Sequence, residues 1–245
     1  MIGKLSTVGD AVLGPARSAQ RVRFGPSDLR RAVNRLTLPR AQRMIRAACG
    51  LSGQIEELAR SDRSVIHELL GPHVVAVPGM QYPDHLVEDS RTGSGYFFHS
   101  HGHSPAHPEE RGHFHVFVRG LAARRSHLVA IALDSYGMPT RLFTTNRWVT
   151  GENWTPVEAL LSGAERFSVT APDSNALLNR WVTWCVQLFH PQLHWLMVRR
   201  DARLRTLAAG RDMERVFEDR RIEIFSECRI SIGQQIAALR AALNA

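Results

Sequence analysis

The spacing of hydrophobic residues divides the chain into a helical beginning, a strand-rich middle and a mainly helical end. Over residues 26–72, apolar positions recur at intervals of three and four, which is typical of amphipathic helices. Over 73–150, β-branched and aromatic residues alternate with polar ones, as strands require. Residues 155–245 return mainly to the helical spacing. Strands grouped between two sets of helices predict an α+β fold, with an antiparallel sheet of four to five strands over about 74–150.

Glycine, proline and capping residues indicate where individual elements end. We expect one helix to open at Pro39 and to stop at Gly50, and the closing helix to be capped by Ser231. A short β-prone run at 74–77 predicts the first strand, and the alternation at 221–226 predicts a late strand.

The length of the chain favours one folded domain preceded by an arm. Residues 1–25 contain Gly, Ser, Ala and Arg without clear periodicity, which predicts a flexible basic arm. Residues 26–245 are long enough to bury a sizeable core without disulfides or a structural metal. A bound metal in this single α+β domain is therefore expected to serve a function other than folding.

The net charge of +8 comes from one region of the chain. Residues 1–49 contain ten basic and two acidic residues, so the remaining residues are neutral overall. The Arg-rich region 17–46 could dock a protein partner. We do not expect nucleic acid as a partner, because no recognised nucleic-acid-binding motif accompanies these arginines.

Cysteine usage and hydropathy predict a cytoplasmic protein without a membrane segment. Cys49, Cys185 and Cys228 are far apart in the sequence, which argues against a disulfide framework and against a thiolate zinc site. The N-terminal residues show no secretory signal. The most apolar segment, residues 181–189, is too short to span a bilayer.

Histidines concentrate in a short part of the strand-rich region. Half of the twelve lie between residues 99 and 115: His99, His101, His103, His107, His113 and His115. Side chains alternate between the two faces of a strand, so the two H-x-H pairs each project to one side. If the segments form a hairpin, four imidazoles can share one patch.

The register that best groups these rings places His99 opposite His115, His101 opposite His113, and Phe97 opposite Phe117. The opposite face of the same hairpin is then apolar and suited to a core. It consists of Tyr96, Phe98, Phe114, Val116 and Val118.

This pattern predicts a metal site made of His99, His101, His113 and His115. Neutral imidazole binds Zn, Fe, Cu and Ni, and the identity of the divalent transition metal stays open. Three of the four would ligate the ion, with Glu109 or Glu110 able to fold back, and the spare histidine could transfer protons. His103 and His107 are expected to be exposed or to belong to a lid. A metal-free polar or catalytic pocket and a purely structural role are the alternatives.

Two further candidates follow the last predicted strand of the central region. Arg147 could bind a substrate carboxylate or phosphate, and Glu152 could act as a base or a ligand. The alternative for both is a structural Arg–Glu pair beneath Trp148.

Three motifs resemble a bacterial family of unknown function. They are Gly-His-Phe-His from Gly112, Asn-Arg-Trp-Val-Thr-Gly-Glu from Asn146, and Glu-Asp-Arg from Glu218. The resemblance extends from about residue 40 to the C-terminus. It implies the same α+β organisation and supplies no activity.

The leading hypothesis is a metal-dependent enzyme acting on a small molecule, such as an oxidoreductase or a hydrolase. The alternatives are a non-catalytic metal-binding accessory protein that docks a partner through its Arg-rich region, and a phosphate or nucleic-acid binder.

Overall fold

The computed structural model of this chain describes residues 23–71, 76–100, 107–120 and 124–244. Several sequence predictions fall outside these ranges. They concern most of the predicted arm, half of the predicted strand at 74–77, and two histidines, His101 and His103.

Helices lie on both sides of the strands in the sequence, as predicted. They are α1 (Pro26–Val33), α2 (Leu38–Arg60), α3 (Val65–Leu70), α4 (Arg147–Thr150), α5 (Val157–Glu165), α6 (Ala176–Leu188), α7 (His190–Ala208), α8 (Met213–Phe217) and α9 (Ile232–Leu243). Within the described ranges, no helix has both the length and the apolar character needed to cross a bilayer.

The strands form one antiparallel sheet. They are β1 (Gln81–Asp89), β2 (Ser94–His99), β3 (Gly112–Arg119), β4 (Arg125–Leu133), β5 (Pro139–Thr145) and β6 (Ile224–Arg229), and they lie side by side in this order. The predicted α+β fold with an antiparallel sheet is therefore confirmed, with six strands in place of four or five. The late strand expected near 221–226 is β6, which pairs with β5.

The first strand lies later in the chain than predicted. Ala76 and Val77 belong to no strand, whereas β1 begins at Gln81. This strand lies at the edge of the sheet and carries exposed polar residues such as Asp84 and His85. These exposed polar residues interrupt the apolar alternation by which the other strands were predicted.

Polar and proline residues set the beginnings of the helices. Asn175 caps α6 by accepting a hydrogen bond from the Leu177 N–H at 2.9 Å. Pro191 lies in the first turn of α7, where its missing N–H costs nothing. The predicted cap of the closing helix is confirmed, because Ser231 Oγ accepts from the Gln234 N–H at 3.3 Å.

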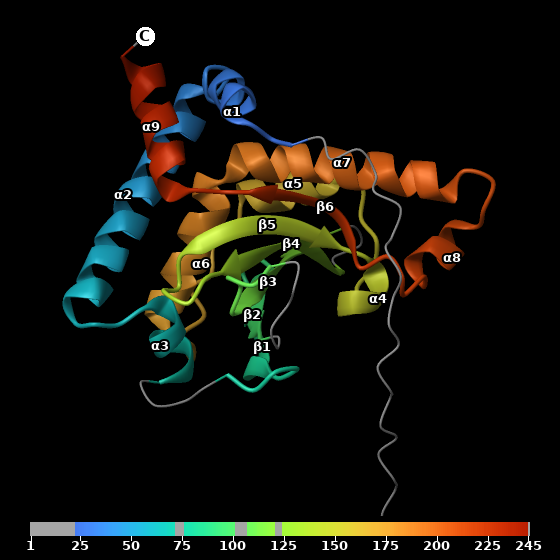
Figure 1. Cartoon of the computed structure of the whole chain (residues 1–245), viewed down its shortest axis with the longest axis horizontal. Coiled ribbons are helices and arrows are strands. Elements are labelled where there is room, and N and C mark those ends of the chain that lie inside the picture. Colours follow the sequence, from blue (N-terminus) through green and yellow to red (C-terminus); the bar gives the residue numbers. More distant parts are fainter. Residues whose placement is uncertain (1–22, 72–75, 101–106, 121–123, 245) are drawn as a thin grey trace, which may run out of the picture.

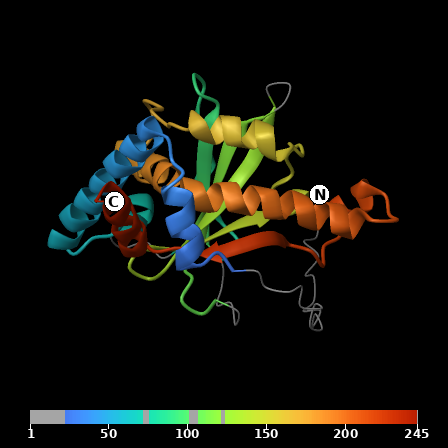
Figure 2. The same ribbon diagram turned by 90° about the horizontal axis from the view of Figure 1, so that it is seen from above.

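Helices cover one face of the sheet (Figure 1). The helices α5, α6 and α7 lie along this face, and α1, α2 and α9 gather at one end of the molecule (Figure 2). Trp181 of α6 packs against Phe114 of β3, with ring centroids 5.4 Å apart. The residues predicted to form the core face of the hairpin are all buried here: Tyr96, Phe98, Phe114, Val116 and Val118.

The strands β2 and β3 pair in a register that differs from the predicted one. His99 lies opposite His113, not His115, and Phe97 lies opposite His115. This is a shift of two residues, so every side chain keeps its predicted face. The contact between Gly112 and Phe98 favours the observed register. A Cβ on Gly112 would lie 2.4 Å from the Phe98 ring, so only glycine allows this approach. The alternation of residues carries no information about such a contact.

The predicted helix end at Gly50 is wrong, because α2 continues through it to Arg60. Gly50 faces α6, and a Cβ there would lie 2.6 Å from the Trp184 ring. A Cβ on Gly53 in the same helix would meet nothing within 4 Å. Gly50 therefore serves close packing between the two helices.

We predict opposite effects for two glycine substitutions in α2. Ala favours a helix over Gly by about 1 kcal/mol, so Gly53→Ala should raise the free energy of unfolding by up to that amount. Gly50→Ala forces Trp184 to move, and overpacking of this kind costs about 1–3 kcal/mol. Urea denaturation of both variants measures the difference. Equal stabilisation by both would contradict the packing described for α2 and α6.

Candidate metal centre on the sheet

Three histidines converge on the face of the sheet opposite the helices. His99 comes from the end of β2, and His113 and His115 come from β3. Each offers one ring nitrogen, and these nitrogens lie within 4.8 Å of one another. His113 and His115 are buried, whereas His99 is half-buried. His99 is therefore the most exposed of the three.

Two of these rings turn the same nitrogen toward each other. Nε2 of His113 lies 3.0 Å from Nε2 of His115. The other nitrogen of each ring has its own partner: Nδ1 of His113 lies 2.9 Å from Oε1 of Glu110, and Nδ1 of His115 lies 3.1 Å from Nε2 of His127. Two ligand nitrogens on a tetrahedral zinc ion lie about 3.3 Å apart. The Nε2 pair is thus close to the spacing of two ligands on one ion.

Glu110 fixes the orientation of the His113 ring and determines which of its nitrogens carries the proton. Arg141 donates to Oε2 of Glu110 at 2.5 Å and to Glu227 at 2.9 Å. Although burial disfavours the charged carboxylate, the hydrogen bond from His113 and the charge of Arg141 lower the pKa of Glu110 to about 2. An ionised carboxylate only accepts hydrogen bonds, so Nδ1 of His113 carries a proton. Nε2 is then the nitrogen that can bind a cation.

His127 of β4 extends this hydrogen-bonded series to β5. Its Nδ1 lies 3.2 Å from Oγ1 of Thr145. Burial, together with the nearby His113 and Arg200, lowers the pKa of His127 to about 3. His127 is therefore neutral at physiological pH, with one donor and one acceptor nitrogen.

If His113 and His115 are neutral, as His127 is, two arrangements of protons are possible. In the first, Thr145 donates to His127, His127 donates to His115, and His115 donates to Nε2 of His113. In the second, the protons of His115 and His127 move to their Nδ1 atoms, and His127 donates to Thr145. Both arrangements have the same number of protons. The second leaves lone pairs on the two facing Nε2 atoms, which is stable only with a cation between them.

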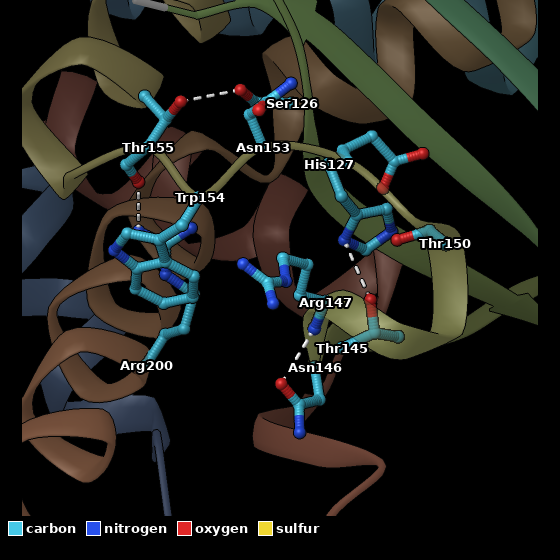
Figure 3. Close-up of a pocket in the computed structure, with 11 residues that line it drawn as sticks. Ser126, His127, Thr145, Asn146, Arg147, Thr150, Asn153, Trp154, Thr155 and Arg200 are labelled. Atoms are coloured by element: carbon cyan, nitrogen blue, oxygen red, sulfur yellow. Dashed lines mark hydrogen bonds between the residues drawn. The ribbon is translucent and has the colours of Figure 1, made fainter. Parts of the chain in front are cut away.

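His127 also lines a small polar pocket (Figure 3). Ser126, Thr145, Arg147 and Glu152 contribute to the same pocket. Its volume is about 20 Å³. A space of this size takes about one water molecule and is too small for a substrate.

Glu152 is the group in this pocket with the most altered acidity. Burial raises the pKa of Glu152 to about 7, although a hydrogen bond with Thr150 and the charge of Arg125 act in the opposite direction. Its Oε2 is buried and has no hydrogen-bond partner within the described ranges. A carboxyl group of this kind can take up and release a proton near neutral pH.

Arg147, the other candidate after β5, is held by acidic residues of α8 and its end. It donates to Glu214 at 2.6 Å and to Glu218 at 2.7 Å, and it lies 4.7 Å above the Phe217 ring. These contacts favour a structural ion pair, with partners other than Glu152. Binding of a substrate anion by Arg147 stays a prediction.

The structure thus brings together three of the four predicted ligands, and the fourth, His101, lies outside the described residues. Glu110 folds back as expected, but it contacts His113 and does not join the ligand group. His107 is half-buried, 3.7 Å from Glu227. Sequence reasoning missed His127. His127 lies on the same face of the neighbouring strand β4. Only the pairing of β3 with β4 reveals this position.

The fold and the site define an α+β protein with a histidine cluster on the face of an antiparallel sheet opposite the helices. A family model described as a domain of unknown function (DUF6969) matches residues 45–230, which is more than half of the chain. The chain therefore belongs to this family, and the expected resemblance to an uncharacterised family is confirmed. No curated protein and no solved structure matches the chain.

We predict that Glu110→Gln destabilises the fold, because the variant removes the charge that pairs with buried Arg141. Hydrogen bonds to charged groups contribute about 1.5–3 kcal/mol, and a loss of this size is expected at neutral pH. The pKa of Glu110 is lower in the folded protein than its ordinary value of 4.5. The wild-type advantage should therefore be full above about pH 4.5 and should shrink as the pH falls toward 2.

The free energy of unfolding at several pH values tests this prediction. Glu109→Gln is the matched control, since Glu109 is the more exposed neighbour, 3.5 Å from Arg229. An equal, pH-independent loss in both variants would contradict the role given to Glu110.

Proposed function

We propose that the protein binds one divalent transition-metal ion through His99, His113 and His115, and that the ion serves a reaction on a small molecule. One observation carries the proposal. The Nε2 atoms of His113 and His115 face each other at 3.0 Å, while a partner holds the Nδ1 atom of each ring. Such outer partners orient the histidine ligands of metal sites and fix their tautomers.

The type and number of ligands favour a catalytic ion over a structural one. Imidazole suits Zn, Fe, Cu and Ni, and catalytic sites commonly use three protein ligands and leave a position for water or substrate. His101 would be a fourth ligand or a proton-transfer group. Since His99 and Phe97 are half-buried and His113 and His115 are buried, a small molecule would approach from the side of His99 and Phe97.

The ion would supply Lewis-acid or redox chemistry, so a hydrolase and an oxidoreductase both fit. The surrounding residues would orient the ligands of the ion and shape the site. Glu110 keeps His113 oriented, and His127 does the same for His115. The Phe97 and Phe117 rings stack 5.4 Å apart beside His115 and give the site an apolar wall.

Glu152 is proposed as the group that exchanges protons with this centre. Its pocket is too small for a substrate, so a role in binding one is not favoured. Nε2 of His127 lies next to His115, and its Nδ1 contacts Thr145, which lines the pocket with Glu152, so a proton path from the carboxyl group to the histidine cluster would run through Thr145 and His127. A neutral imidazole that both donates and accepts can pass a proton between these two places.

Metal content tests the proposed ligands. Protein purified without a histidine tag and reconstituted with Zn²⁺ should bind one equivalent, and His113→Ala/His115→Ala should lose it. Glu110→Gln should weaken binding by about 10–100-fold, as losses of outer partners do. His85→Ala is the control, because His85 is exposed on β1. Unchanged zinc content in the double variant, measured by mass spectrometry of the metal, would exclude this site.

The acidity of Glu152 is tested by its carboxyl ¹³C resonance in a pH titration. We expect Glu152 to titrate at about pH 7. Because the pKa of Glu152 is higher in the folded protein than its ordinary value of 4.5, wild-type stability should fall relative to Glu152→Gln as the pH rises from about 4.5 to about 7. Titration of Glu152 near pH 4.5 would contradict the proposed proton exchange.

A further inference from the structure

A row of side chains continues from the histidine cluster along the same face of the sheet. Alternate residues of a strand project from one face, and on β3 these residues are His113, His115, Phe117 and Arg119. Phe97 of β2 stacks on Phe117, and the Phe97 ring lies 5.1 Å from the His115 ring. The histidines, an aromatic pair and a basic residue therefore follow one another on this face.

A second arginine, Arg125 of β4, lies at the far end of this row. Its Cζ atom is 5.8 Å from the centre of the Phe117 ring, so its guanidinium lies on the face that carries the histidines. The strand register places Arg125 directly opposite Arg119, and both residues are exposed. Two cationic side chains thus lie beyond the aromatic pair, as viewed from the histidines.

Carboxylates compensate this pair of arginines only in part. Arg119 donates to the backbone oxygen of Ser90 at 3.0 Å, and neither arginine forms an ion pair within the described ranges. Arg125 acts on Glu152, but the pKa of Glu152 is about 7, so its compensation is incomplete at neutral pH. Exposed Glu88 of β1 is three strands from Arg125, about 14 Å at the usual strand spacing. An anion beside Arg125 therefore meets a net positive potential.

The spacing of these groups defines the length and shape of a ligand. Successive residues on one face of a strand are about 7 Å apart, so Arg119 lies about 13 Å from His115. The guanidinium and imidazole groups fill part of this span, which leaves room for a ligand on the order of 10 Å long. The ring of Phe97 is half-buried and lies between the two ends. It offers a flat apolar surface to the middle of the ligand.

The availability of the two guanidinium groups favours a carboxylate as the anion. Since Arg119 already donates to the Ser90 carbonyl, Arg125 has the more accessible pair of donors. A planar guanidinium binds a carboxylate through two parallel hydrogen bonds. One such pair matches the single charge of a carboxylate better than the double charge of a phosphate.

We propose that the metal site acts on aromatic carboxylates, with the carboxylate on Arg125, the ring on Phe97 and the reacting group facing the three histidines. The role as a substrate rests on the proposed function. Binding of the carboxylate and the ring requires neither the ion nor its ligands. Metal-free protein should therefore bind such a molecule.

Three probes separate the contributions of the charge and the ring, with metal-free, full-length protein. trans-Cinnamate has both, cinnamamide has the same planar shape without the charge, and hexanoate has the charge without the ring. In ¹H–¹⁵N titrations, cinnamate should bind about three- to tenfold more tightly than either analogue. Because the arginines are exposed, about 0.5 M NaCl should remove its advantage over cinnamamide. The metal is left out because zinc itself binds carboxylates.

Arg125→Gln tests the assigned arginine, and Arg124→Gln is the matched control. Arg124 is the adjacent exposed arginine, and it donates to Asn153 at 3.0 Å. Both variants lose one positive charge, so a general electrostatic effect would be the same in both. Arg125→Gln should bind cinnamate no better than cinnamamide, whereas Arg124→Gln should bind it as the wild type does. Phe97→Leu should weaken binding of cinnamate and leave that of hexanoate unchanged. If Phe97→Leu does not fold, the arginine pair still decides the test.

The proposal is overturned if no probe binds, if cinnamate and cinnamamide bind equally to the wild type, or if the two arginine variants bind cinnamate alike. Zinc content, measured separately, distinguishes this failure from that of the metal centre. Zinc uptake without cinnamate binding would contradict only the substrate class. Cinnamate binding by a protein that takes up no zinc would contradict the metal centre and keep the carboxylate site.

Discussion

Buried imidazole rings are stable only when each ring nitrogen has a partner, and this constraint organises the face of the sheet that carries the histidines. Here the partners form a continuous series from Glu110 through His113, His115 and His127 to Thr145. Arg141 anchors its acidic end. The series contains a direct contact between two histidines, and with all three rings neutral its acceptors and donors can be ordered in two ways. Only one order exposes a pair of lone pairs, and a cation is what would stabilise it.

The two faces of β3 have different roles: one packs against the helices, and the other carries the histidines. Phe114, between the two buried histidines, faces the helices and packs against Trp181. Because residues alternate along a strand, a close-packed apolar layer supports the positions of His113 and His115 directly. A site on a regular strand is held more rigidly than one on a loop. This rigidity explains how two Nε2 atoms can be kept 3.0 Å apart.

The amino-acid pattern predicts the fold class, the faces of the hairpin and three of the converging histidines. Alternation determines which face a residue occupies, but it leaves the register free by two residues, so the partner of His99 was predicted wrongly. Gly112 helps to set the register through its contact with Phe98, and Gly50 lies inside α2 because Trp184 packs on it. Both glycines look like ordinary turn or stop residues in the sequence.

The sequence alone also could not predict the roles of residues whose partners are distant in the chain, because these roles depend on tertiary contacts. His127 is far from the H-x-H pairs in the sequence and joins them only because β4 pairs with β3. The altered pKa of Glu152 arises from burial, which depends on how the segment after β5 packs. Each of these features requires the tertiary arrangement, whereas periodicity and composition report only local structure.

A metal ion bound by His99, His113 and His115 would have their imidazole nitrogens in its first shell. X-ray absorption at the zinc edge, on protein loaded with one equivalent of Zn²⁺, measures this shell. We expect at least three imidazole nitrogens at about 2.0–2.1 Å, with the multiple-scattering pattern of histidine rings. A first shell of sulfur, or of oxygen without imidazole, would contradict it.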